Sequence, residues 1–279
     1  MRAALRLRPV PAAGGLRWVG DGWRLFKRRP VALTLTLASF MLVLVALMML
    51  PWAIGVPLVL MSPPLLSLGM MIAGQSALLD GPVHPRQFLE PLRGDRRRRA
   101  AILTLCGLYG LIVVLAAAFC FWLGDDATRQ FAAVLSGREP GADDPRRMAE
   151  IAALPGMRSA VWCFNVVMLL ISVPFWHAPA LVHWGSQGVA QALFSSTLAL
   201  WRTKAAFTLY GLAWAGISVV VGSVASVLLA VLGVGAFGAL LPMCVMLAAW
   251  AVFHMSVLFT FNDSFGGATP PAAEISPPA

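Results

Sequence analysis

Few side chains in the apolar segments of this 279-residue chain could carry chemistry. Outside the cysteines, they are His177, His183, His254, Tyr109 and Tyr210. Three histidines can hold a metal ion when a fold brings them together. These three have no H-E-x-x-H motif and no accompanying carboxylate, so we expect no metal site, no cofactor and no catalytic residue. We interpret the histidines as neutral rings bonded to backbone carbonyls that nearby prolines leave free.

The cysteines offer a second kind of chemistry. Cys106, Cys120, Cys163 and Cys244 all lie in apolar runs, and no C-x-x-C pair is present. Cys120 and Cys163 fall near the outer ends of two predicted spans, where a disulfide is possible in an oxidising periplasm. We favour the alternative, in which they pack as small apolar residues.

The densest charged feature is the run Arg96, Arg97, Arg98 and Arg99. A cation near an anionic lipid surface contributes about 1 kcal/mol to binding, so the run is a candidate site for anionic phospholipid headgroups. The alternative is that the run only sets membrane topology by resisting translocation. The cytoplasmic end of any span needs residues that resist translocation, so the role in topology is the simpler interpretation of the run.

Small residues recur at every fourth position on one face of a late apolar segment: Ser218, Gly222, Ser226 and Ala230. Such a face lets helix backbones approach closely, so it predicts a packing seam. The seam can lie within the bundle, which we favour, or against another copy of the chain.

The amino-acid composition indicates that these residues belong to a protein embedded in a lipid bilayer. Hydrophobic residues make up 59% of the chain and charged residues only 12%, against about 25% in soluble domains. The net charge of +9 gathers beside the ends of apolar runs, so the anionic partner is the lipid bilayer and not nucleic acid.

Hydropathy predicts an all-α integral membrane protein with six transmembrane helices arranged as three hairpins. The spans are about 31–52, 56–79, 101–123, 159–184, 205–232 and 237–261, within a membrane domain of residues 31–262. Pro57, Pro63 and Pro64 interrupt the second span, Pro174 and Pro179 interrupt the fourth, and Pro242 lies in the sixth. The even helices are therefore expected to be broken.

The remaining segments are polar or amphipathic. Residues 1–30 form a cytoplasmic basic arm and an interfacial helix, and 185–204 form a second interfacial helix. A periplasmic insert covers 124–158, with a short helix opening at Asp144-Pro145. Residues 263–279 are expected to be a disordered cytoplasmic tail. Seven tryptophans fall near predicted interfaces: Trp18, Trp23, Trp52, Trp122, Trp162, Trp184 and Trp201.

The positive charges predict the orientation. If both termini are cytoplasmic, the inner segments hold 16 of the 21 Lys and Arg residues, and the outer insert holds five that six acidic residues balance. This asymmetry is typical of a bacterial inner-membrane protein with both termini inside.

A basic or amphipathic segment precedes each hairpin, which suggests a threefold repeat. Trp23 and Lys27 precede the first span, and a similar pair, Trp201 and Lys204, precedes the fifth. The opening Gly22-Trp23-Arg24-Leu25-Phe26-x-Arg28-x-Pro30, with the proline-rich second span and the six-span layout, resembles a family of uncharacterised bacterial inner-membrane proteins. More loosely, the layout is similar to the membrane domain found ahead of the catalytic domain in some glycerophosphodiesterases. The resemblance implies the fold and no activity, and the 35-residue insert is too short for that catalytic domain.

We therefore expect a non-enzymatic inner-membrane protein of structural, assembly or lipid-interacting type. Its expected partners are the bilayer and anionic phospholipids, with a membrane-protein partner or another copy of the chain as further possibilities. The alternative is a transporter or permease subunit for a neutral or lipid-like substrate, because discontinuous helices often surround transport sites. Charged solutes are disfavoured, since the predicted spans contain no Asp, Glu, Lys or Arg.

Overall fold

A computed structural model describes residues 7–136, 144–232 and 236–266. These residues contain helices and no β-strand, which confirms the predicted all-α membrane fold. The start of the basic arm, the middle of the insert (137–143), the turn at 233–235 and most of the predicted tail (267–279) lie outside the described residues.

The apolar segments pair into three hairpins. The first joins α2 (Pro30–Met48) to α3 (Trp52–Leu60) and α4 (Pro63–Leu78); the second joins α5 (Arg96–Leu123) to α8 (Pro155–Phe175); the third joins α11 (Lys204–Leu232) to α12 (Ala236–Phe265). Within the described residues, five helices are long and apolar enough to cross a membrane, or six if the bent pair α3–α4 is one span. The six predicted spans correspond to these elements.

Helices start and end where caps and prolines allow, and not where polarity changes. The Asp95 carboxylate accepts the Arg98 N–H at 2.7 Å, so α5 begins at Arg96, five residues before the predicted span. Helix α8 begins at Pro155 because proline favours the first helical turn. Helix α12 continues to Phe265, so the predicted tail from residue 263 begins with ordered helix.

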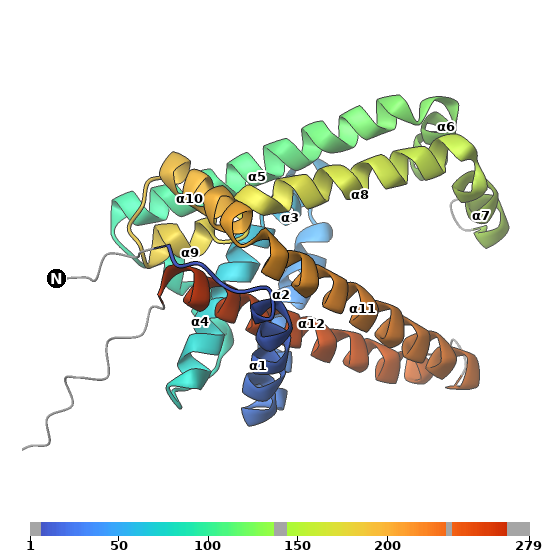
Figure 1. Ribbon diagram of the computed structural model, residues 1–279. Coiled ribbons are helices and arrows are strands. Elements are labelled where there is room, and N and C mark those ends of the chain that lie inside the picture. Colours follow the sequence, from blue (N-terminus) through green and yellow to red (C-terminus); the bar gives the residue numbers. More distant parts are fainter. Residues whose placement is uncertain (1–6, 137–143, 233–235, 267–279) are drawn as a thin grey trace, which may run out of the picture.

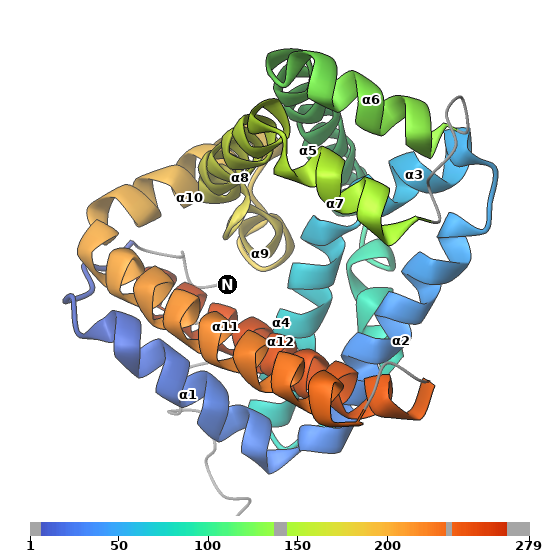
Figure 2. The ribbon, with the colours of Figure 1, turned by 90° about the vertical axis from the view of Figure 1, so that its right-hand side faces the viewer.

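The hairpins meet at one end of the molecule and diverge toward the other. In Figure 1 the α5–α8 and α11–α12 hairpins separate as they extend away from α4 and the short helix α9 (Ala178–His183). Seen after a 90° turn, the three hairpins are arranged around α4 and α9 (Figure 2). Helix α4 packs against α2, α5, α9 and α12, so it joins the three hairpins.

Prolines break the second and fourth spans, as predicted, but the prediction that the sixth span is also broken was wrong. The chain bends by 48° between α3 and α4, where Pro63 and Pro64 occupy the first turn of α4. In the fourth span, α8 ends at Phe175, directly after Pro174, and two residues separate it from the start of α9 at Ala178. Pro242, by contrast, lies inside α12 without ending it.

Helix α1 (Gly14–Arg28) packs on protein and not only on lipid. It lies along α11 and α12, and Trp18 is fully buried. The Trp18 indole N–H donates to Asp263 at 2.8 Å, and Arg17 forms an ion pair with the same carboxylate at 2.6 Å. Trp18 is therefore held by a carboxylate at the end of α12, inside the protein, and its predicted headgroup depth stays a prediction.

The polar segments are mostly helical. The insert contains α6 (Asp125–Leu135) and α7 (Pro145–Ala153), and the Asp144 side chain caps α7 by accepting the Arg146 N–H at 2.9 Å. Helix α10 (Val189–Arg202) precedes the third hairpin, as α1 precedes the first.

The proposed repeat is only partial. Lys27 lies over the Trp23 ring at 6.0 Å, and Lys204 lies over the Trp201 ring at 5.1 Å, so the two similar pairs form the same contact. The second hairpin is instead preceded by two short 3₁₀ turns, η1 (Pro85–Phe88) and η2 (Glu90–Leu92).

Candidate ligand cavity and the arginine run

An aromatic cluster lies at the centre of the molecule. Phe253 of α12 contacts the rings of Trp176, Tyr210 and Trp214, with centroid distances from 5.2 to 6.3 Å. None of these tryptophans falls near a predicted interface, and neither does Trp250. That departure from the usual interfacial position was a signal in the sequence that pointed to this cluster.

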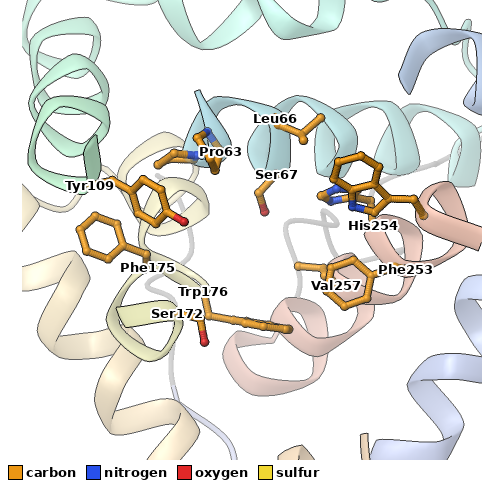
Figure 3. A pocket seen from close by; sticks show the side chains of 12 residues that line it. Pro63, Leu66, Ser67, Tyr109, Ser172, Phe175, Trp176, Phe253, His254 and Val257 are labelled. Atoms are coloured by element: carbon orange, nitrogen blue, oxygen red, sulfur yellow. The ribbon is translucent and has the colours of Figure 1, made fainter. Parts of the chain in front are cut away.

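A cavity of about 230 Å³ borders the cluster where the hairpins meet. Helices α4, α5, α8 and α12 contribute its walls, which are lined by Pro63, Pro64, Leu66, Ser67, Tyr109, Ser172, Phe175, Trp176, Trp250, Phe253, His254 and Val257. The Ser67 and Tyr109 hydroxyls and the His254 ring project toward the same space (Figure 3). A mostly apolar cavity with a few convergent polar groups is typical of small-molecule sites.

His254 is the most informative residue of this cavity. Its side chain is 6% exposed, and its ring stacks on Trp250 with centroids 6.0 Å apart. Within the described residues, neither ring nitrogen has a hydrogen-bond partner. A buried polar atom without a partner costs about 1–3 kcal/mol. The predicted bond from this histidine to a free backbone carbonyl was therefore wrong.

His177 has a different environment, deep in the break between α8 and α9. Its Nε2 lies 3.0 Å from the Thr260 hydroxyl, and its ring contacts Phe207, Phe261 and Phe265. Its partner is thus a side-chain hydroxyl and not the predicted carbonyl. No group of three metal-ligating side chains, including His183, occurs in the part of the chain that the structure describes.

A second apolar cavity, of about 360 Å³, lies on the other side of Trp250. It runs between α11 and α12, and Trp250 and Phe253 line both cavities. Trp250 itself is 42% exposed, so the two spaces are separated by a side chain that is not locked into the core.

The four arginines form the first turn of α5. Arg96, Arg97 and Arg99 are exposed, and Arg98 is half-buried. Arg97 and Arg98 line a hollow of about 150 Å³ together with Asp95, Ala101, Val182 and residues 186–188. Across the described ranges, no carboxylate lies within ion-pair distance of these four guanidinium groups, whereas Arg129 and Arg147 of the insert both have acidic partners.

Their position at a helix N-terminus adds to this unbalanced charge. The first backbone N–H groups of a helix carry a partial positive charge, which the arginines do not compensate. Asp95 accepts only one of those N–H groups. This end of α5 therefore favours an additional anion.

The predicted proximity of Cys120 and Cys163 is confirmed. Their sulfur atoms lie 3.2 Å apart, joining α5 to α8, and both cysteines are free thiols. Cys120 is buried, as the apolar interpretation expects, while Cys163 is half-buried. The pair is therefore positioned for oxidation, with Cys163 providing access.

We predict that a mild thiol oxidant such as diamide links Cys120 to Cys163. The two thiols lose two protons and two electrons to the oxidant, so the intact mass falls by that of two hydrogen atoms. Mass spectrometry of the digested protein should find the two peptides joined. The Cys163→Ser variant is the control. Joined peptides that instead contain Cys106 or Cys244 would contradict the geometry.

The predicted packing seam on the fifth span is not a seam within this chain. Ser218, Ser226 and Ala230 are exposed, and nothing lies within 4 Å of an added Cβ at Gly222. The buried residues of α11 are Ala206, Tyr210, Trp214 and Ala225, so α11 joins the core through both aromatic and small side chains.

Comparison with known proteins agrees with a membrane location. The chain is 29% identical over 273 residues to a probable inner membrane protein of Burkholderia thailandensis, covering 97% of this chain and 98% of that protein. No protein-family profile matches the chain. No solved structure matches it. The apolar helices and the full-length likeness together make this an inner-membrane protein, and the looser likeness to glycerophosphodiesterase membrane domains stays a prediction.

Proposed function

We propose that this inner-membrane protein is non-enzymatic and interacts with anionic phospholipids, whose headgroups bind Arg96, Arg97, Arg98 and Arg99. The observation that carries this proposal is the absence, among the described residues, of an acidic partner for any of the four. Exposed cations at the end of an apolar helix lie at headgroup depth, where lipid phosphates supply the missing anions.

The proposed orientation places both termini in the cytoplasm. Arg8 donates its backbone N–H to the Ser264 carbonyl at 2.9 Å, so the two ends of the described chain lie together, as an even number of crossings requires. The start of α5 and helix α10 lie at this same end, while α6 and α7 lie at the far end (Figure 1). Segregation of the basic segments to one end supports this orientation through the positive-inside rule.

Native mass spectrometry of protein extracted gently from its own membrane tests the proposal. We expect retained anionic lipid on the natural protein and its loss when Arg96 to Arg99 are changed to Gln. Each removed cation should weaken binding by roughly 1 kcal/mol, about fivefold. Two control variants are matched: four Lys at the same positions keep the charge and should keep the lipid. Gln at Arg129, Arg146, Arg147 and Arg158 removes equal charge from the insert and should leave the amount of retained anionic lipid almost unchanged.

Two results would contradict the lipid assignment. Equal lipid retention in the Gln variant would return the run to a role in topology. A second protein copurifying in fixed ratio, with no specific lipid, would instead indicate an assembly subunit.

A permease for a neutral or lipid-like substrate is the second candidate function. The observation in its favour is that the 230 Å³ cavity borders the bend at Pro63 and Pro64 and the end of the broken helix α8. Discontinuous helices around a central site are typical of transporters. Uptake lost in proline-to-alanine variants at this bend, with folding intact, would favour it over the lipid-interacting role.

A further inference from the structure

We propose that the cavity around His254 binds the ring of a membrane quinone. The inference concerns binding alone, and it depends neither on the arginine run nor on whether a substrate is moved across the membrane. Three properties of the cavity walls carry it: their charge, their shape and their unsatisfied hydrogen-bonding groups.

The charge of the walls indicates a neutral ligand. None of the twelve lining residues is Asp, Glu, Lys or Arg. An ionised headgroup would lose its hydration in this apolar space without gaining a counter-charge, which is unfavourable. Phospholipid headgroups are thereby disfavoured here, although they suit the arginine run.

The shape of the walls indicates a flat ligand. Five lining residues are aromatic (Tyr109, Phe175, Trp176, Trp250 and Phe253), in addition to the His254 ring. Aromatic side chains gain from offset-stacked or edge-on contact with another conjugated ring. A saturated acyl chain would not use these ring faces, whereas a quinone ring would.

The polar groups of the walls suit a ligand with an oxygen at each end. The neutral His254 ring offers one N–H donor, and within the described residues neither of its nitrogens has a partner. The Tyr109 hydroxyl projects into the same space from the side across from His254, and the Ser67 hydroxyl projects into it from between the two (Figure 3). One carbonyl of a quinone can accept from Tyr109, and the His254 ring, whose nitrogens are covered by neighbouring atoms, turns toward the cavity to donate to the opposite carbonyl.

The apolar tail of a quinone also has a place to lie. The 360 Å³ cavity beyond Trp250 is apolar and runs along α11 and α12, and most residues of the apolar α11 face outward from the protein. Trp250 is partly exposed between the two cavities. A tail that follows this route reaches the bilayer, where membrane quinones reside.

Titration of the purified protein with decylubiquinone, followed by tryptophan fluorescence, tests the inference. We expect saturable quenching, because Trp176 and Trp250 line the cavity. Loss of one neutral hydrogen bond should weaken binding roughly two- to tenfold. His254→Phe keeps the stacked ring and removes both nitrogens, and Tyr109→Phe removes only a hydroxyl, so both variants should show this loss. Ser226→Ala, which removes an exposed hydroxyl from α11, should bind normally.

Three outcomes would overturn the inference. Quenching that does not saturate would mean that the quinone only partitions into detergent. Unchanged quinone affinity in Tyr109→Phe would also overturn the inference, and this result can be interpreted even if His254→Phe fails to fold. Displacement by decanol as effective as by decylubiquinone would assign the cavity to an aliphatic lipid.

Discussion

Changing Gly22 to Ala should destabilise the protein, whereas changing Gly20 to Ala should stabilise it. An added Cβ at Gly22 would lie 2.7 Å from both the Cβ and the backbone N of Ser256, so α1 would have to move away from α12. Overpacking of this kind costs about 1–3 kcal/mol. At Gly20 nothing lies within 4 Å, so alanine should only improve helix propensity, by about 0.5–1 kcal/mol.

The free energy of unfolding, from denaturant titration in detergent, measures both changes. If the two glycine-to-alanine changes shift the free energy of unfolding in opposite directions, a general gain in helix propensity cannot explain both results. Equal stabilisation by both would show that α1 does not lie directly on α12. Gly15 should behave like Gly22, because its added Cβ would collide with the Ala206 carbonyl of α11.

Removal of the Ser196 hydroxyl should destabilise the break between α8 and α9. Ser196 is fully buried on α10; its hydroxyl accepts the His177 N–H and donates to the Val173 carbonyl, both at 3.0 Å. In Ser196→Ala these two backbone groups lose their partner, and buried polar groups without partners cost about 1–3 kcal/mol each.

The neighbouring Thr197 provides the matched control for Ser196. Its hydroxyl bonds only to the Leu193 carbonyl of its own helix and is exposed, so Thr197→Ala should change stability by less than about 0.5 kcal/mol. Thermal unfolding in detergent compares the two variants. A Ser196→Ala midpoint equal to that of Thr197→Ala would show that the break does not depend on this side chain.

Hydrogen bonds from Ser196 and Thr260 explain how the discontinuous helices of the fourth span form one core with their neighbours. Pro174 and Pro179 disrupt the regular hydrogen bonding of the fourth span. Ser196 from α10 replaces part of it, and Thr260 of α12 accepts the Trp176 indole N–H at 3.2 Å. Partners from neighbouring helices are what permits such breaks at membrane depth.

The two proposed ligand sites differ in the physics that selects their occupants. The arginine run is exposed, cationic and at a helix N-terminus, so electrostatic attraction dominates there and should weaken in salt. The His254 cavity is uncharged and aromatic, so ring contact and hydrogen bonds dominate. A rise in salt concentration should therefore separate the two, by reducing lipid retention at the run while leaving quinone binding unchanged.

The sequence by itself determined the class of protein, the pairing of spans and the breaks in the second and fourth spans. Long apolar runs without charge must be helical in lipid, because every backbone polar group needs a partner within the segment. Prolines interrupt that pattern at Pro63, Pro64 and Pro179 though not at Pro242, and capping residues such as Asp95 and Asp144 act on their own helices. All of these effects are local, so they can be predicted from neighbouring residues.

Only the tertiary structure decided the contacts between residues far apart in the chain. It buried Trp18 against Asp263, turned the small-residue face of α11 outward and left His254 beside a cavity with its ring nitrogens unpartnered. Apolar segments in a membrane have no hydrophobic preference for protein over lipid, so hydropathy does not specify which faces meet. Close approach at Gly22 and single hydrogen bonds at Ser196 and Asp263 decide that instead, because they exist only once the helices are assembled.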